Sequence, residues 1–142
     1  TPSRLDTVIR VKKHQEKKAQ HELGQIQEKK ETEKKALTSL RAEHASAVGE
    51  AGQVAHASAT ELQANHAFIQ RLSRQIERQQ QTVDKIQQRE QVKREEVVEK
   101  SKSKKIVERL DEKRRVEQAR EMGKKEQGVL DVLAQRIKPT EK

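Results

Sequence analysis

Proline placement is the feature that most limits how this chain can fold. The two prolines, Pro2 and Pro139, stand at its two ends, and no proline interrupts the sequence between them. Proline breaks a helix because it lacks an amide proton and clashes with the preceding turn. The chain is also rich in Lys, Glu, Gln, Arg, Ala and Leu, which lose little rotamer freedom in a helix. We therefore expect an all-α protein with long helices.

The apolar content decides how these helices can pack. Hydrophobic residues make up 30% of the chain and charged residues 39%. Such a composition cannot fill a compact core, but it suffices for helices that share a narrow apolar stripe.

Two such stripes are visible at alternating spacings of three and four residues. In the first, nine of fourteen positions are apolar, and Lys12, Glu16, Lys30, Glu33 and His44 interrupt it. This spacing predicts the seam of a coiled coil. The first stripe comprises Leu5, Ile9, Lys12, Glu16, Ala19, Leu23, Ile26, Lys30, Glu33, Leu37, Leu40, His44, Ala47 and Ala51. The second comprises Leu62, Asn65, Ile69, Leu72, Ile76, Gln79, Val83, Ile86, Glu90, Lys93 and Val97.

The segment between the stripes has the composition of a turn. Gly49 and Gly52 can end the first helix, and Ser58 with Glu61 forms a capping box for the second. We predict one domain, 1–142, folded as a long antiparallel two-helix coiled-coil hairpin with a longer C-terminal helix. Helix 1 is expected at about 3–48, the turn at 49–58 and helix 2 at 59–138. The alternative is one uninterrupted helix that dimerises.

This layout leaves the end of the second helix without a partner in the chain. With a turn near residue 53, Leu5 should face a residue near 100–110, and the last 25–30 residues should extend beyond the first helix. The segment "DEKRRVEQAREMGKKEQG" is polar all round, which is typical of a helix that bridges solvent, is unstable alone or is ordered by another protein. Residues 101–142 also carry 13 basic and 8 acidic residues.

The sequence has no pattern typical of catalysis. It has no cysteine, its glycines are scattered, and none of its histidines forms an HExxH motif or an i,i+4 pair. A two-helix rod also offers no pocket that excludes water. We expect no enzyme activity, cofactor or metal. No apolar run is long enough to span a membrane, and the N-terminus has no secretory signal, so we expect a cytoplasmic protein.

A net charge of +9 makes nucleic-acid binding an alternative function, because a basic chain attracts phosphates without any motif. Against it, the basic residues alternate with Glu, as in "EKKETEKK", and aromatic stacking platforms are missing. Nucleic acid is therefore not an expected partner. A homodimeric spacer is a further alternative.

Phe68 is the only aromatic residue in the chain. It lies on the flank of the second stripe, where with Leu72 it forms an apolar pair expected to lie partly outside the seam. Such a pair can dock a partner, or Phe68 can simply cover the thin seam near the turn. The residues alone favour neither interpretation.

The chain resembles the FliJ family of the bacterial flagellar protein export apparatus, which is related to the stalk proteins of type III secretion. The resemblance rests on "FIQRLSRQIE", on the tail "KKEQGVLDVLAQRIKP" and on the two-helix layout. It implies a stalk that inserts into the hexameric flagellar export ATPase, contacts the cytoplasmic domain of the export-gate membrane protein and assists the cycling of export chaperones. The implied location is the cytoplasmic face of the flagellar basal body, with membrane contact only through partners.

The resemblance also implies site residues. The export-gate face of the family corresponds to Phe68 and Leu72, followed by Gln75 and Gln79, where this sequence departs from the family in being polar and uncharged. For the ATPase ring we expect contacts from basic residues of the second helix. These are Arg109, Arg114, Arg115 and Arg120.

Overall fold

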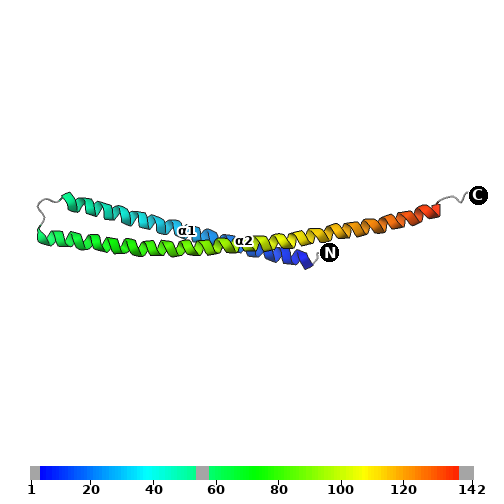
Figure 1. The fold of residues 1–142 in the computed structure, drawn as a ribbon, viewed down its shortest axis with the longest axis horizontal. Helices are drawn as coiled ribbons and strands as arrows, with labels where there is room; N and C mark the ends of the chain where they lie inside the picture. Colours follow the sequence, from blue (N-terminus) through cyan, green and yellow to red (C-terminus); the bar gives the residue numbers. More distant parts are fainter. Residues whose placement is uncertain (1–3, 54–57, 138–142) are drawn as a thin grey trace, which may run out of the picture. The chain divides into compact units, whose positions relative to one another are not determined.

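The protein consists of two long α-helices packed against each other (Figure 1). The computed structural model describes residues 4–53 and 58–137. Helix α1 spans Arg4–Gln53 and helix α2 spans Ala59–Ile137, and these described residues contain no strand. The predicted all-α class and the longer C-terminal helix are confirmed.

The packing divides the chain into two compact units. Unit 1 combines residues 1–16 with 99–142, and unit 2 is formed by residues 17–98. Both helices contribute to each unit, and within each unit the cross-helix pairs run antiparallel. The expectation of a single domain over 1–142 stays a prediction.

A side-chain cap begins α2 where the sequence predicts it. The amide of Glu61 donates to Ser58 Oγ over 3.2 Å, and the amide of Leu62 donates to the Ser58 carbonyl over 3.0 Å. These bonds satisfy amides that have no partner inside the helix. The predicted helix limits at residues 3 and 138 lie outside the described residues.

Helix α1 continues about one turn beyond its predicted end at residue 48. Gly49 and Gly52 both lie inside the helix, and no described glycine has a positive φ. Glycine ends a helix when it takes the left-handed conformation. Inside a helix it costs only up to about 1 kcal/mol, which the surrounding alanines, good helix formers, help to offset.

The predicted seam is almost entirely confirmed. All fourteen α1 positions are buried or half-buried, as are all α2 positions of the stripe except Leu62. Leu62 is 48% exposed. His44 pairs with Ser73, so by the same antiparallel pairing Leu62 would face a position beyond Gln53, where α1 has ended.

The polar interruptions of the two stripes meet one another in unit 2. Lys30 Nζ lies 2.5 Å from Glu90 Oε2. The Gln79 amide donates to the Glu33 carbonyl over 3.0 Å and also to its carboxylate. The seam is therefore held by matched polar pairs as well as by the apolar pairs that the spacing predicts.

In unit 1 the helices are joined mainly by polar contacts. Lys104 Nζ lies 3.0 Å from Glu16 Oε2, and Arg115 donates to Asp6 over 3.3 Å. The pairing of Asp6 with Arg115 corrects the expectation that Leu5 faces residues 100–110, since α1 extends further and shifts the turn along the chain. Beyond this pair, every described residue from 112 to 137 is exposed.

Candidate functional site

The residues expected to contact the export gate do not share one accessible face. Phe68 is 40% exposed, and the Arg71 guanidinium lies 6.0 Å from its ring centroid. Leu72 is only 3% exposed. It fills the seam between Ile69 and Ile76, so the expectation that it lies partly outside the seam is wrong.

The two glutamines of this group also differ from each other. Gln75 is exposed, whereas Gln79 is half-buried and hydrogen-bonded to Glu33 of α1. A partner approaching this part of α2 can thus reach Phe68 and Gln75 without disturbing the helix pair. A binding role for all four residues stays a prediction.

The four arginines expected at the ATPase ring are exposed but do not form one cluster. Arg109 and Arg120 line a shallow groove that also includes Val116. Arg114 points away from them, because five residues along a helix turn it by about 140° from Arg109. Arg115 is exposed as well, but its guanidinium is paired with Asp6 of α1 at 3.3 Å and with Asp111 at 3.1 Å.

The last two turns of α2 carry an apolar surface that sequence reasoning did not single out as a site. Five large side chains there are between 45% and 76% exposed. These apolar residues stand together in the run "VLDVLAQRI", but the expectation for this end of the helix rested on the polar segment before it. The residues are Val129, Leu130, Val132, Leu133 and Ile137.

The most strongly bonded ionic groups lie at the centre of unit 2. Glu90 accepts from Lys30 and from Arg94, whose Nη2 lies 2.6 Å from Glu90 Oε1. These hydrogen bonds, first from Lys30 and then from Arg94, lower the pKa of Glu90 to about 2 although burial opposes the charged form. Glu90 therefore stays ionised at every ordinary pH.

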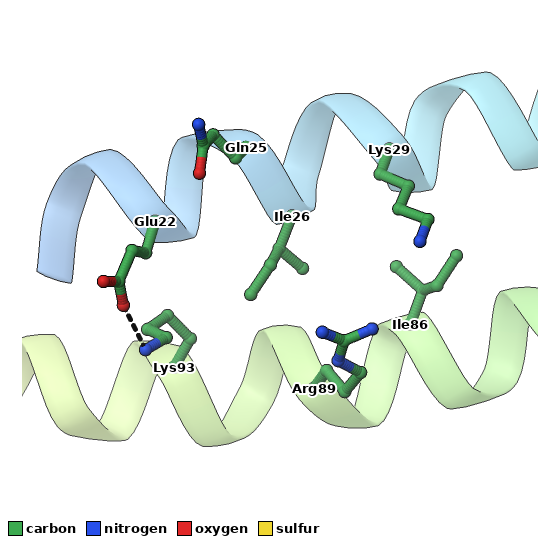
Figure 2. A pocket seen from close by; sticks show the side chains of 7 residues that line it. All are labelled: Glu22, Gln25, Ile26, Lys29, Ile86, Arg89 and Lys93. Atoms are coloured by element: carbon green, nitrogen blue, oxygen red, sulfur yellow. Dashed lines mark hydrogen bonds and ion pairs between the residues drawn. The ribbon is translucent and has the colours of Figure 1, made fainter.

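Next to this pair lies a groove of about 360 Å³ between the two helices (Figure 2). Lys93 Nζ at one end bonds Glu22 at 2.6 Å and Glu96 at 2.8 Å. The hydrogen bond to Glu22, followed by that to Glu96, raises the pKa of Lys93, and the bond from Lys93 lowers the pKa of Glu22. The remaining lining is Gln25, Ile26, Lys29, Ile86 and Arg89.

No candidate metal site and no candidate membrane span lies in the part of the chain that the structure describes. Its His, Asp and Glu residues form no group of three that could hold a metal ion. Over the same residues, neither helix carries an apolar stretch able to span a bilayer.

Comparison with known proteins identifies the family. The model of the flagellar FliJ protein family matches residues 2–138. The chain belongs to the FliJ family. Membership makes it a flagellar export-related protein, and it fits a non-catalytic component of the export machinery. Neither a curated protein nor a solved structure shows a significant match.

Proposed function

We propose that this FliJ-family chain is a stalk-like coiled coil of the flagellar export apparatus, acting at the cytoplasmic face of the basal body. In this proposal it binds the hexameric export ATPase through unit 1 and the export-gate membrane protein near Phe68, and it assists the cycling of export chaperones. The observation that carries the proposal is that α2 continues well past its last α1 contact with all its described side chains exposed.

Two features of this free part of α2 support a partner-bound role. Its last two turns expose the apolar surface Val129–Ile137, which a solvated helix has no reason to carry. Where this part begins, Arg109 and Arg120 flank Val116 in a groove that Glu112, Lys113 and Glu117 also line, so it carries charges of both signs around an apolar centre. A surface of this kind can form contacts weak enough to be exchanged as a ring changes state.

The first experiment measures ATP hydrolysis by the cognate export ATPase with and without the full chain. We expect stimulation that is lost in a chain truncated after Asp111 and strongly reduced by Val129→Ser with Val132→Ser. The matched control is Val48→Ser with Val98→Ser, which removes valines of similar exposure in unit 2. Failure of the helical full-length chain to stimulate the ATPase would overturn the ring-binding proposal.

A second experiment addresses the gate. Phe68→Ala should weaken binding to the isolated cytoplasmic domain of the export gate by about tenfold or more, since buried aromatic anchors often contribute 2 kcal/mol or more. Leu62→Ala, which removes a similarly exposed residue near the start of α2, is the control. Leu72→Ala does not test the contact, because Leu72 is buried in the seam and its loss would weaken the helix pair itself.

A further inference from the structure

The groove in unit 2 has cations that the fold itself does not use. Among the described residues, Lys29 and Arg89 take part in no ion pair or hydrogen bond, although both line the groove. Figure 2 shows Lys29 extending from α1 toward Ile86 of α2, with the Arg89 guanidinium beside Ile86 on the side of the groove nearer Lys93. Two like charges directed into one space repel each other, and an anion between them would remove that cost.

The charge of the groove changes along its length. At one end, Lys93 is shared by Glu22 and Glu96, so the positive charge is already compensated. At the other end stand Lys29 and Arg89, and Lys85 lines a second hollow on α2 that adjoins the first through Arg89 and Lys93. An occupant must therefore place its negative charge at one end only.

The floor and rim of these hollows are apolar. Ile86 at the bottom of the groove is buried between the helices, Ile26 beside it is half-buried, and Val92 next to the groove is 64% exposed, more than most large apolar side chains of the chain. Apolar floors suit side chains of a helix or strand and offer nothing to a phosphate backbone. Glu22 at the compensated end would also repel a continuous polyanion.

We propose that this groove docks an acidic amphipathic helix of a partner protein. Carboxylates of that helix lie between Lys29 and Arg89, and its apolar side chains cover Val92 and the accessible part of Ile26. The two helices of unit 2 then form a three-helix arrangement with the partner, in which apolar anchors give affinity and charge-assisted pairs fix position. This surface is separate from Phe68 and from the free end of α2, and it does not depend on the proposed function.

The probe is a synthetic helical peptide with leucines at positions i and i+3 and glutamates beside them, compared with a glutamine version of the same peptide. Binding to the full chain is followed by fluorescence anisotropy. We expect binding of the glutamate peptide that weakens as salt is raised, and about tenfold weaker binding of the glutamine peptide, since charge-assisted hydrogen bonds are lost.

The decisive variant is Lys29→Glu with Arg89→Glu, which reverses two charges without breaking a hydrogen bond or ion pair of the structure. Its matched control, Lys17→Glu with Lys35→Glu, makes the same charge change at exposed lysines of α1 in unit 2. Circular dichroism checks that both remain helical. We expect the groove variant not to bind the glutamate peptide, whereas the control variant still binds it. A lysine version of the peptide should bind the groove variant instead.

Three results would overturn the proposal. If the groove variant and the control lost affinity for the glutamate peptide equally, the binding would be a general attraction to a basic protein. Absence of binding by the unaltered chain would show that the groove takes no such helix. Tighter binding of a single-stranded DNA oligonucleotide, lost in the groove variant, would make the groove a phosphate site.

Discussion

Glu90 shows how a single polar residue can act in a seam of this kind. It is 3% exposed, yet it sits at a stripe position where an apolar residue would be expected. Its carboxylate is compensated from both helices, by Lys30 of α1 and Arg94 of α2. A buried charge is costly unless it is paired, so only one alignment of the helices satisfies it. Glu90 thus selects the register of unit 2.

Glu90→Ala should lower the free energy of unfolding by about 1–3 kcal/mol, because it leaves Lys30 without its partner in the seam. This decrease in stability is smaller than the decrease expected when one partner of a fully buried ion pair is removed, because the Arg94 side chain is 54% exposed and reaches water. Urea unfolding followed by circular dichroism measures it. In contrast, Lys30→Leu with Glu90→Leu should be close to neutral or stabilising, because two apolar side chains then fill the seam. If the double variant lost as much free energy of unfolding as Glu90→Ala, this interpretation would be contradicted.

The lowered pKa of Glu90 also predicts a dependence on acid. Its folded pKa is about 2 against an ordinary value of 4.5, so the unfolded chain takes up the proton first as the pH falls. The stabilisation is fully present above the ordinary value, declines below it and is gone below about pH 2. Between pH 4.5 and about 2, the free energy of unfolding should fall less in the variant Lys30→Leu with Glu90→Leu than in the unaltered chain. Identical pH profiles would exclude Glu90 as the source.

At the scale of the elements, each helix combines good and poor helix formers. The glycines Gly24, Gly49 and Gly52 all lie within α1, and a Cβ added at any of them meets no heavy atom within 4 Å. These positions therefore carry the entropic cost of glycine with no steric reason for it. In α2, the Ser58 cap sets the beginning of the helix.

Gly24→Ala should stabilise the helix pair by about 0.5–1 kcal/mol, because alanine restricts the unfolded chain and fits the open space. Thermal unfolding of the variant is compared with that of Gly123→Ala in the free part of α2. The second substitution should raise the helical signal but leave the main transition unchanged, since no α1 residue packs there. A destabilised Gly24→Ala would mean that the backbone is not helical at this position.

The whole molecule pairs its helices within one chain. Every cross-helix contact described, from Asp6 with Arg115 to His44 with Ser73, joins α1 and α2 of the same chain. These pairs are the antiparallel pairs that the predicted hairpin requires. The units differ in burial: all described buried residues, among them Leu37, Leu72 and Val83, belong to unit 2.

Intrachain pairing predicts that the unfolding temperature does not change with protein concentration. A dimer would gain stability by mass action as concentration rises. Circular dichroism melts over a wide concentration range, with sedimentation equilibrium for the mass, check this expectation. A melting temperature that rises steadily with concentration would favour the dimeric alternative.

The sequence predicts the stripe better than the contacts across it. A 3–4 spacing places Leu37 and Ile86 on the seam whatever their partners are. It cannot pair Lys30 with Glu90, because that pairing depends on where the turn lies, and the helical conformation of Gly49 and Gly52 moved the turn. The spacing also places Phe68 at the flank of the stripe, whereas the partners of Gln79 and Arg115, which are Glu33 and Asp6, depend on the register. The apolar residues of Val129–Ile137 are visible in the sequence, but the prediction for this end of α2 rested on the polar segment that precedes them.

The confinement of buried side chains to unit 2 has a calorimetric consequence. The heat capacity change of unfolding grows with the apolar surface that becomes hydrated. With only Ala19, Leu37, Leu72, Val83 and Ile86 as buried apolar residues in the described chain, that surface is small. The stability curve is then shallow, and cold destabilises the protein little. Unit 1 contributes few apolar contacts, so its helix pair should lose structure gradually on warming, well before the denaturation peak of unit 2.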